Sequence, residues 1–271
     1  MRPTRTLTAG ILSVVLLAGC SESEIPVRSR VTVTESVFVT VTEPRSADAP
    51  EVEATPPAGE AAQPVSPAGD YLYNQSVGDL PAGSAGEVAI IARGVPDKYG
   101  TVQVVVRNNT GAPVSQIGLT GVAYDASGAI VGSGEDHGFN PGYVADGEIS
   151  MGYLYFGSDT VKPDSDVDIT VDSESGDDDF GLYVRNLVIS DVNVTGTAVL
   201  GRLTNPHDVA VSGPISVDLV CFDAEGTPID MHQTYADADE VDPGGQATFS
   251  IDFSDPGPCE SFLMAASGYG R

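Results

Sequence analysis

Residues 215–226 read Ile-Ser-Val-Asp-Leu-Val-Cys-Phe-Asp-Ala-Glu-Gly. Apolar residues occupy every second position from Ile215 to Cys221, and the stretch then ends in Phe-Asp-x-x-Gly. When apolar residues recur at every second position, they lie on one face of an extended strand and the residues between them lie on the other. In an amphipathic helix the period is 3.6 residues instead. Asp followed shortly by Gly is typical of a turn. The stretch therefore predicts a strand that buries one face and ends in a tight turn.

The same period of two recurs along the chain from residue 100 onward. Alternating rows also occupy residues 102–106, 151–155, 167–171 and 249–253. Turns rich in Gly, Pro, Asn and Asp separate the rows, at residues 108–111, 126–128, 242–245 and 255–258. Short alternating strands between such turns are typical of antiparallel β-sandwiches. The sequence therefore predicts an all-β fold.

An internal duplication organises this region. Two correspondences lie 96 residues apart and the others lie 98 residues apart: Gly100/Gly196, Asn109/Asn205, Tyr124/Phe222, Gly128/Gly226, Gly147/Gly245, Met151/Phe249 and Tyr155/Phe253. The register holds across glycine, aromatic and apolar positions together. It predicts two homologous domains, at 70–173 and 180–271, joined by an acidic hinge at 174–179.

Each predicted copy contains a strand that ends in an aromatic residue and Asp. These strands are Gly121-Val122-Ala123-Tyr124-Asp125 and Leu219-Val220-Cys221-Phe222-Asp223, and each follows a strand that ends in Asn. This order resembles the bacterial FxLYD-type immunoglobulin-like domain, although Ala123 and Cys221 stand where that family has leucine. The resemblance implies two tandem immunoglobulin-like β-sandwich domains. It also implies a surface lipoprotein, without implying a particular activity.

The N-terminus has the parts of an export signal. Arg2 and Arg5 precede an apolar run from Leu7 to Leu17, and Leu17-Ala18-Gly19-Cys20 follows. A run of about 11 apolar residues suits a signal peptide and is too short to span a bilayer. Leu-Ala-Gly-Cys resembles the bacterial lipoprotein box, which implies that residues 1–19 are removed and that Cys20 carries the lipid. The alternative is an ordinary secretory signal with a chance cysteine.

The segment that follows Cys20 is poor in core-forming residues. It is rich in Glu, Ala, Pro, Ser and Thr, and prolines recur between residues 44 and 68. Such a composition favours extended, solvated backbone. We therefore predict that residues 20–69 are a disordered stalk that holds the domains away from the extracytoplasmic face of the cell membrane.

The charge balance restricts the partners. The chain has 12 Lys and Arg against 39 Asp and Glu, a formal net charge of -27. Phosphate binding needs Lys and Arg, so this balance excludes nucleic acid as a partner. The predicted partners are the membrane, through the N-terminal lipid, and either an envelope protein or a cell-wall component.

Two cysteines remain once Cys20 carries the lipid. Cys221 and Cys259 lie 38 residues apart in the second predicted domain. Exported proteins fold in an oxidising compartment, so we predict a disulfide between them. Two buried free thiols are the alternative.

One acidic loop is a candidate metal site. Asp237, Asp239, Glu240 and Asp242 fall within six residues and could offer oxygens to calcium. The loop lacks the spaced Gly and distal Glu of an EF-hand, so a solvated acidic loop is the alternative. No other cofactor is predicted.

Residues that signal catalysis are scarce. His137, His207 and His232 lack the spacing of zinc motifs, and the chain has no Gly-x-Ser-x-Gly or Ser-x-x-Lys motif. The sequence therefore predicts a non-enzymatic, membrane-anchored surface lipoprotein that binds or scaffolds. The alternative is a lipoprotein that binds a divalent cation or a small solute, and an envelope hydrolase is the least supported reading.

Overall fold

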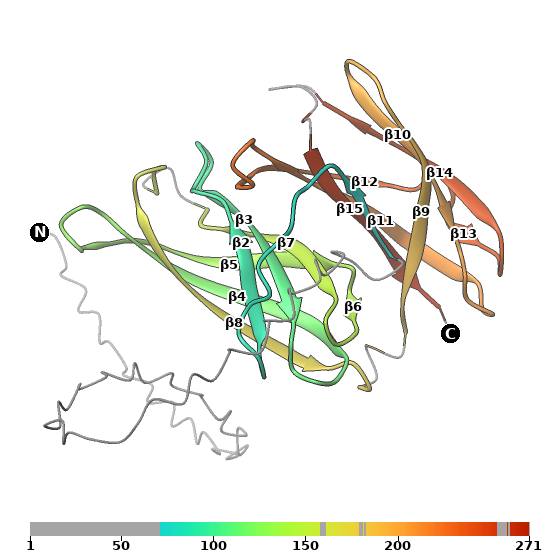
Figure 1. Ribbon diagram of the computed structural model, residues 1–271, viewed down its shortest axis with the longest axis horizontal. Coiled ribbons are helices and arrows are strands. Elements are labelled where there is room, and N and C mark those ends of the chain that lie inside the picture. Colours follow the sequence, from blue (N-terminus) through green and yellow to red (C-terminus); the bar gives the residue numbers. More distant parts are fainter. Residues whose placement is uncertain are drawn as a thin grey trace, which may run out of the picture. The chain divides into compact units, whose positions relative to one another are not determined.

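The computed structural model of the chain describes residues 71–157, 161–178, 181, 183–253, 259 and 261–270. The predicted signal peptide, Cys20 and the predicted stalk lie outside these residues. Every regular element within the described ranges is a β-strand, which confirms the all-β prediction (Figure 1). No helix in this part of the chain is long and apolar enough to cross a membrane.

The first half of the described chain forms an antiparallel sheet around an apolar core. Its strands are β2 (Val88–Arg93), β3 (Thr101–Asn108), β4 (Val114–Tyr124), β5 (Ile130–Asn140), β6 (Tyr143–Val144), β7 (Ile149–Tyr155) and β8 (Asp166–Ser175). The strand order is β2-β3-β7-β5-β4, and both β6 and β8 pair with β4. Val102, Val104 and Val106 of β3 lie in the core, as their alternation predicts.

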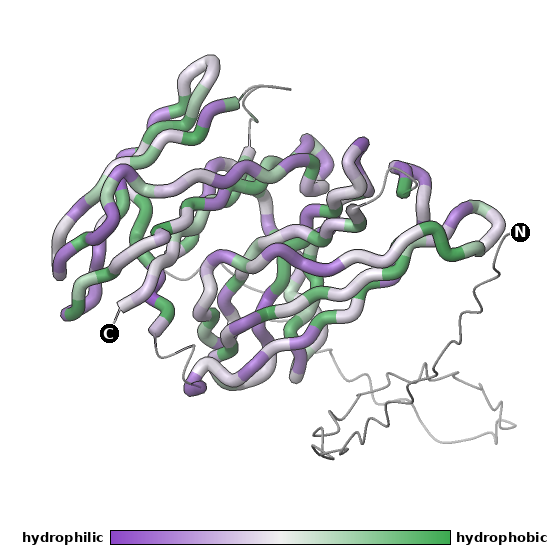
Figure 2. Tube along the Cα trace, turned by 180° about the vertical axis from the view of Figure 1, so that it is seen from behind, coloured by the Kyte–Doolittle hydropathy of each residue, from purple (hydrophilic) through white to green (hydrophobic). Residues whose placement is uncertain are grey.

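The second half repeats this element order around a core of its own. Its strands are β9 (Val184–Val194), β10 (Ala198–Thr204), β11 (Val211–Phe222), β12 (Pro228–Tyr235), β13 (Glu240–Val241), β14 (Gln246–Asp252) and β15 (Ser261–Tyr269). The strand order is β12-β11-β15-β9-β10-β14. The alternating row of β11 lies in this core: Ile215, Val217, Leu219 and Cys221. The hydropathy of the chain trace alternates along many of these strands (Figure 2).

The first strand of the described chain does not join its nearest neighbours in sequence. β1 (Leu72–Gln75) pairs antiparallel with β15, so that Leu72 lies opposite Ala265 and Gln75 opposite Phe262. The sequence alone assigned these residues to the first predicted domain, which began at residue 70. Backbone pairing depends on which strand edge is open rather than on chain order, and β15 supplies that edge.

Two buried asparagines make matching hydrogen bonds in the two halves. Asn108 Nδ2 donates to the carbonyl oxygens of Ala112 (2.7 Å) and Val144 (2.9 Å). Asn205 Nδ2 donates to those of Val209 (2.8 Å) and Val241 (2.9 Å). The partners lie at the same spacing along the chain in both cases, which supports the duplication. The counterpart of Asn205 is therefore Asn108, 97 residues earlier, and not Asn109.

The same correction applies to β7 and β14. The amide of Phe156 donates to Gly100, and that of Phe253 donates to Thr197, again at an offset of 97. Tyr155 is therefore not the counterpart of Phe253, and Met151 is not that of Phe249. A shift of one residue moves a strand's side chains to the opposite face. The row Met151, Tyr153 and Tyr155 accordingly lies on the opposite face of β7 from the core residue Leu154.

The predicted Asp turns are present in both halves at the predicted offset of 98. Asp125 Oδ1 accepts hydrogen bonds from the amides of Ser127 (2.8 Å) and Ala129 (3.0 Å). Asp223 Oδ1 accepts the equivalent pair from residues 225 and 227. Each turn closes on a glycine with φ near +80°, a conformation in which a Cβ would be strained.

Part of the predicted hinge is tied to the first half. β8 runs through Ser175, and the Asp178 carboxylate accepts hydrogen bonds from Ser115 Oγ (3.3 Å) and Gln116 Nε2 (3.2 Å). The backbone amide of Gly181 donates to the same carboxylate at 2.6 Å. Asp179, the last residue of the predicted hinge, lies outside the described residues.

A third apolar cluster joins the two halves. It contains buried residues of the first half, among them Val105 and Met151, and residues of the second half, among them Val220 and Leu263. β3, β11 and β15 each carry runs of consecutive buried residues rather than alternating ones. Strands with this pattern are buried on both faces. One face of each of these strands therefore packs in the core of its own half, and the other face packs against the other half.

Candidate functional site

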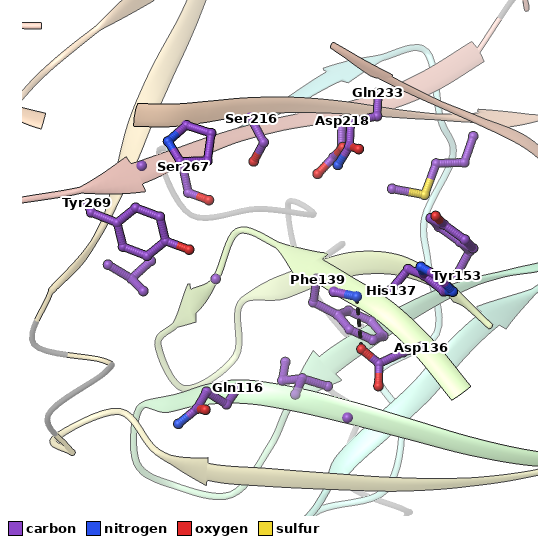
Figure 3. A pocket seen from close by; sticks show the side chains of 18 of the residues that line it. Gln116, Asp136, His137, Phe139, Tyr153, Ser216, Asp218, Gln233, Ser267 and Tyr269 are labelled. Carbon is purple, nitrogen blue, oxygen red and sulfur yellow. Dashed lines mark hydrogen bonds between the residues drawn. The ribbon is translucent and has the colours of Figure 1, made fainter. Parts of the chain in front are cut away.

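A cavity of about 470 Å³ opens where the two halves meet (Figure 3). Both halves contribute to its wall. The polar and aromatic lining residues are Gln116, Asp136, His137, Phe139 and Tyr153 from the first half and Ser216, Asp218, Gln233, Tyr235, Ser267 and Tyr269 from the second. A concave site with a few convergent polar groups between two packed bodies is the usual form of a small-molecule site.

Asp218 is the buried charged group of this cavity. It lies on β11 between Val217 and Leu219, whose side chains enter the core of the second half, so the Asp218 side chain lies on the opposite face of the strand. Asp218 is only 4% exposed to solvent. Burial raises the pKa of its carboxyl group to about 6, although hydrogen bonding to Asn140 and Gln233 opposes this rise. One carboxylate oxygen, Oδ1, has no hydrogen-bond partner.

Asn140 fastens the end of β5 to the second half. Its Nδ2 lies 3.2 Å from Ser216 Oγ on β11 and 3.3 Å from the carbonyl oxygen of Ala265 on β15. The residue is 1% exposed, so these bonds are shielded from water. Asn140 thereby positions β5 against the strand that carries Asp218.

An irregularity in β5 presents His137 to the cavity. The pairing of β5 with β7 shifts between Asp136 and Phe139, and Gly138 has a φ of 101°. The Asp136 carboxylate accepts hydrogen bonds from the backbone amides of Leu119 and Gly138, both at 2.9 Å. The Asp136 carboxylate therefore holds the irregular segment of β5 in place and ties it to β4.

Aromatic rings form the wall beside Asp218. The His137 ring stacks on that of Tyr153, with centroids 5.3 Å apart and planes 7° apart. Tyr155 meets the His137 ring edge-on at 5.5 Å. Burial raises the pKa of the Tyr153 hydroxyl, and the negative charge of Asp218 raises it further. Asp218 and Tyr153 therefore line one cavity from opposite halves.

A second cavity, of about 860 Å³, adjoins the first along this wall. The two share His137, Tyr153, Met231 and Gln233. The second cavity adds a polar pair, in which His232 Nε2 lies 3.3 Å from Asp230 Oδ2. Burial raises the pKa of Asp230, but His232, the backbone amide of Met231 and the charge of Lys98 together hold the pKa below its ordinary value. The two cavities therefore share part of their walls.

The structure pairs the two predicted cysteines. Cys221 and Cys259 form a disulfide, with Cα atoms 5.5 Å apart. Cys221 is buried in the core of the second half, and Cys259 packs against that core just before β15. The predicted disulfide is confirmed.

The predicted acidic loop lies elsewhere. Asp237, Asp239, Glu240 and Asp242 are all exposed. Asp237 Oδ2 accepts a hydrogen bond from Thr248 Oγ1 at 2.7 Å. No group of three or more His, Cys, Asp or Glu side chains within the described ranges is arranged to hold a metal ion. The structure therefore does not bring the four calcium candidates together.

The sequence of β11 contains a second pattern, besides the alternating core row, that points to the cavity. Positions 216, 218, 220 and 222 form the second face of β11, and that face ends in Val220 and Phe222. Apolar residues on both faces of a strand indicate that both faces are buried. A charged residue within such a strand is a candidate for function, because an unpaired charge is costly to bury.

His137 also differs from its prediction. The sequence indicated an ordinary loop residue, whereas the structure places His137 within β5 and in both cavities. His232 lies on β12 beside Asp230, and His207 Nε2 lies 2.8 Å from the carbonyl oxygen of Asn186.

No protein-family model matches the chain, and no curated protein sequence matches it.

Proposed function

We propose that this protein is a lipid-anchored, non-enzymatic binding protein of the extracytoplasmic membrane surface, and that it binds its ligand in the cavity between its two halves. The lipoprotein-type sequence Leu17–Cys20 supports the anchor. The recurring Asp turns at Asp125 and Asp223 support the FxLYD-type immunoglobulin-like identity of the halves. The stalk would hold the cavity within reach of solutes, envelope proteins or the cell wall.

The observation that carries the binding proposal is the unpaired Oδ1 of Asp218. Buried polar atoms in folded proteins almost always have a hydrogen-bond partner, and exceptions call for an explanation. Here the exception lies in the wall of a cavity of about 470 Å³, a size typical of small-molecule sites. A bound ligand that donates a hydrogen bond would complete the site.

Binding is favoured over catalysis by how the remaining polar groups are used. Asp136, the other carboxylate of the cavity wall, accepts backbone amides. The His137 ring stacks on Tyr153 rather than pairing with a carboxylate. A His-carboxylate pair is the usual basis of general acid–base work. The structure shows one such pair nearby, His232 with Asp230, but it lines the adjoining cavity and not the one that holds Asp218. The groups of this cavity hold the fold and shape a pocket.

The anchor predicts where the protein is found in cells. Replacing Cys20 with Ser removes the thiol that accepts the lipid, because a hydroxyl is not acylated in its place. We expect most of the protein to leave the membrane fraction, and we expect mass spectrometry to find acyl chains on wild-type Cys20 only. Retention of the Cys20→Ser variant in carbonate-washed membranes would overturn the lipid anchor.

The cavity predicts a solute that stabilises the protein. We expect a screen of small cationic, neutral and anionic solutes to raise the melting temperature of the purified full chain. Replacing Ser267 with Phe fills the cavity and should abolish the rise. The matched control, Ser133→Phe, adds the same ring at an exposed position of β5 and should leave the rise unchanged. A solute that stabilises all three proteins equally would contradict binding in this cavity.

A further inference from the structure

The wall of the cavity between the halves has a clear charge sign. Its ionisable lining side chains include two aspartates, Asp136 and Asp218, and the described lining residues include no lysine or arginine. The Asp136 carboxylate is already occupied by the amides of Leu119 and Gly138. Asp218 therefore presents the available negative charge, on a chain whose formal net charge is -27. Such a field attracts cations and repels anions.

Asp218 also specifies a hydrogen-bond donor. An ionised carboxylate only accepts hydrogen bonds, and its Oδ1 lacks a donor in this wall. Charge-assisted bonds from an ammonium or guanidinium to a carboxylate are about twice as strong as neutral ones. A ligand with N–H donors and a positive charge satisfies both requirements at once.

The neighbouring rings suit an organic cation rather than a bare metal ion. Tyr153, stacked on His137, and Phe139 line the same cavity. Cations are attracted to the faces of aromatic rings, and the rings also cover apolar carbon. Calcium, in contrast, requires about six to eight oxygen ligands, which one free carboxylate does not supply.

We propose that the cavity binds a small organic cation, whose ammonium or guanidinium N–H donates to Asp218 Oδ1 and whose carbon skeleton lies against the ring of Tyr153. This rests on the proposed binding function of the cavity and names its ligand class. The cation is either a free amine or a lysine or arginine side chain of a partner. Both carry the same chemistry to Asp218.

The site should respond to pH. A cation needs the ionised form of Asp218, whose pKa is raised to about 6 by burial. The other ionisable groups that face this cavity are Asp136 and His137 from β5, Tyr153 from β7, Tyr235 from β12 and Tyr269 from β15. Affinity should fall about tenfold between pH 7.5 and pH 5, because only about a tenth of a group with a pKa near 6 is ionised at pH 5.

Calorimetry on the purified full chain tests the ligand class. The probes are phenethylamine, agmatine and the neutral analogue 2-phenylethanol, at about 0.15 M salt, which screens attraction to exposed charges. We expect the amines to bind and 2-phenylethanol to bind at least tenfold more weakly. Asp218→Asn should weaken the amines at least tenfold. Asp168→Asn removes the same charge from an exposed position on β8 and should leave them within twofold.

Two further experiments identify where the cation comes from and which group causes the pH dependence. A short capped peptide containing one lysine reports on a partner's side chain; tighter binding than phenethylamine supports that source, and weaker binding supports a free amine. In a His137→Gln background the fall in affinity at low pH should persist, and in Asp218→Asn it should vanish.

The proposal is overturned if neither the amines nor the peptide bind, if Asp218→Asn binds them as well as wild type, or if 2-phenylethanol binds equally. A neutral or anionic solute that binds in the cavity while amines do not would overturn the cationic class alone. That result would leave the proposed binding function in place, because the cavity-filling Ser267→Phe variant tests that function separately.

Discussion

Replacing Asp218 with Asn is expected to raise the free energy of unfolding of the ligand-free protein by about 3 kcal/mol at pH 7.5. The carboxyl group has a pKa of about 6 in the folded protein against an ordinary value of 3.8. The folded state therefore binds the proton more tightly than the unfolded state. A difference of about two pKa units corresponds to roughly 3 kcal/mol, since each unit is worth about 1.4 kcal/mol.

The sign follows from this difference. Between pH 3.8 and about 6, the folded state holds more protons than the unfolded state, so the stability of the wild type falls as pH rises through that window. The Asn variant has no proton to lose there. The two proteins should have similar stability near pH 3.5 and should diverge as pH rises, up to a constant gap above about pH 7.

Urea unfolding across this pH range measures the effect. Asp168→Asn is the matched control, because Asp168 is exposed on β8, and it should follow the wild-type curve. A curve for Asp218→Asn that runs parallel to the wild type would contradict the raised pKa of the buried Asp218 carboxyl group. Adding the amine ligand to the wild type should raise its free energy of unfolding toward that of Asp218→Asn. This result would connect the cost of burying the carboxylate to ligand binding.

Removing the disulfide is expected to lower the free energy of unfolding by about 3–4 kcal/mol. The bridge closes a loop across a sequence separation of 38 residues, and the chain-entropy model gives roughly 4 kcal/mol for a loop of this size. The bridge joins β11 to the segment before β15, two neighbouring strands of the second half. Its loss should therefore loosen the unfolded chain without changing the strand pairing.

The Cys221→Ala/Cys259→Ala variant and the reduced wild type should show the same drop in unfolding free energy by urea denaturation. The first half provides an internal precedent for the folded state, because the buried Ala123 occupies the position corresponding to Cys221 without a bridge. Near-ultraviolet circular dichroism should accordingly remain native in the variant. Unchanged stability on reduction would show that the bridge does not constrain the unfolded chain.

Local patterns predicted strands that the structure confirms at β3, β7, β8, β11 and β14, and turns at Asp125 and Asp223. The alternation at Val102–Val106 and Ile215–Cys221 decided which side chains enter the cores. Asp223 and Gly226 decided a turn through their own hydrogen bonding and backbone freedom. These features depend on neighbours in sequence, and a linear pattern is enough to identify them.

Register was harder to predict from sequence. The sequence paired Asn109 with Asn205, whereas the buried hydrogen bonds identify the adjacent Asn108 as the counterpart. An error of one residue also paired Met151 with Phe249, and it obscured which face of β7 carries Tyr153. A period of two does not distinguish which face is buried when both faces have partners.

Composition and short-range spacing are enough to predict an all-β chain with paired Asp turns, a strongly acidic balance and one pair of cysteines in the second half. The pairing of β1 with β15, and the meeting of Asp218 and Tyr153 in one cavity, depend instead on how distant segments pack. Residues 65 positions apart come together there because two sheets pack face to face. That packing is set by the summed burial of apolar surface, which no single stretch of sequence displays.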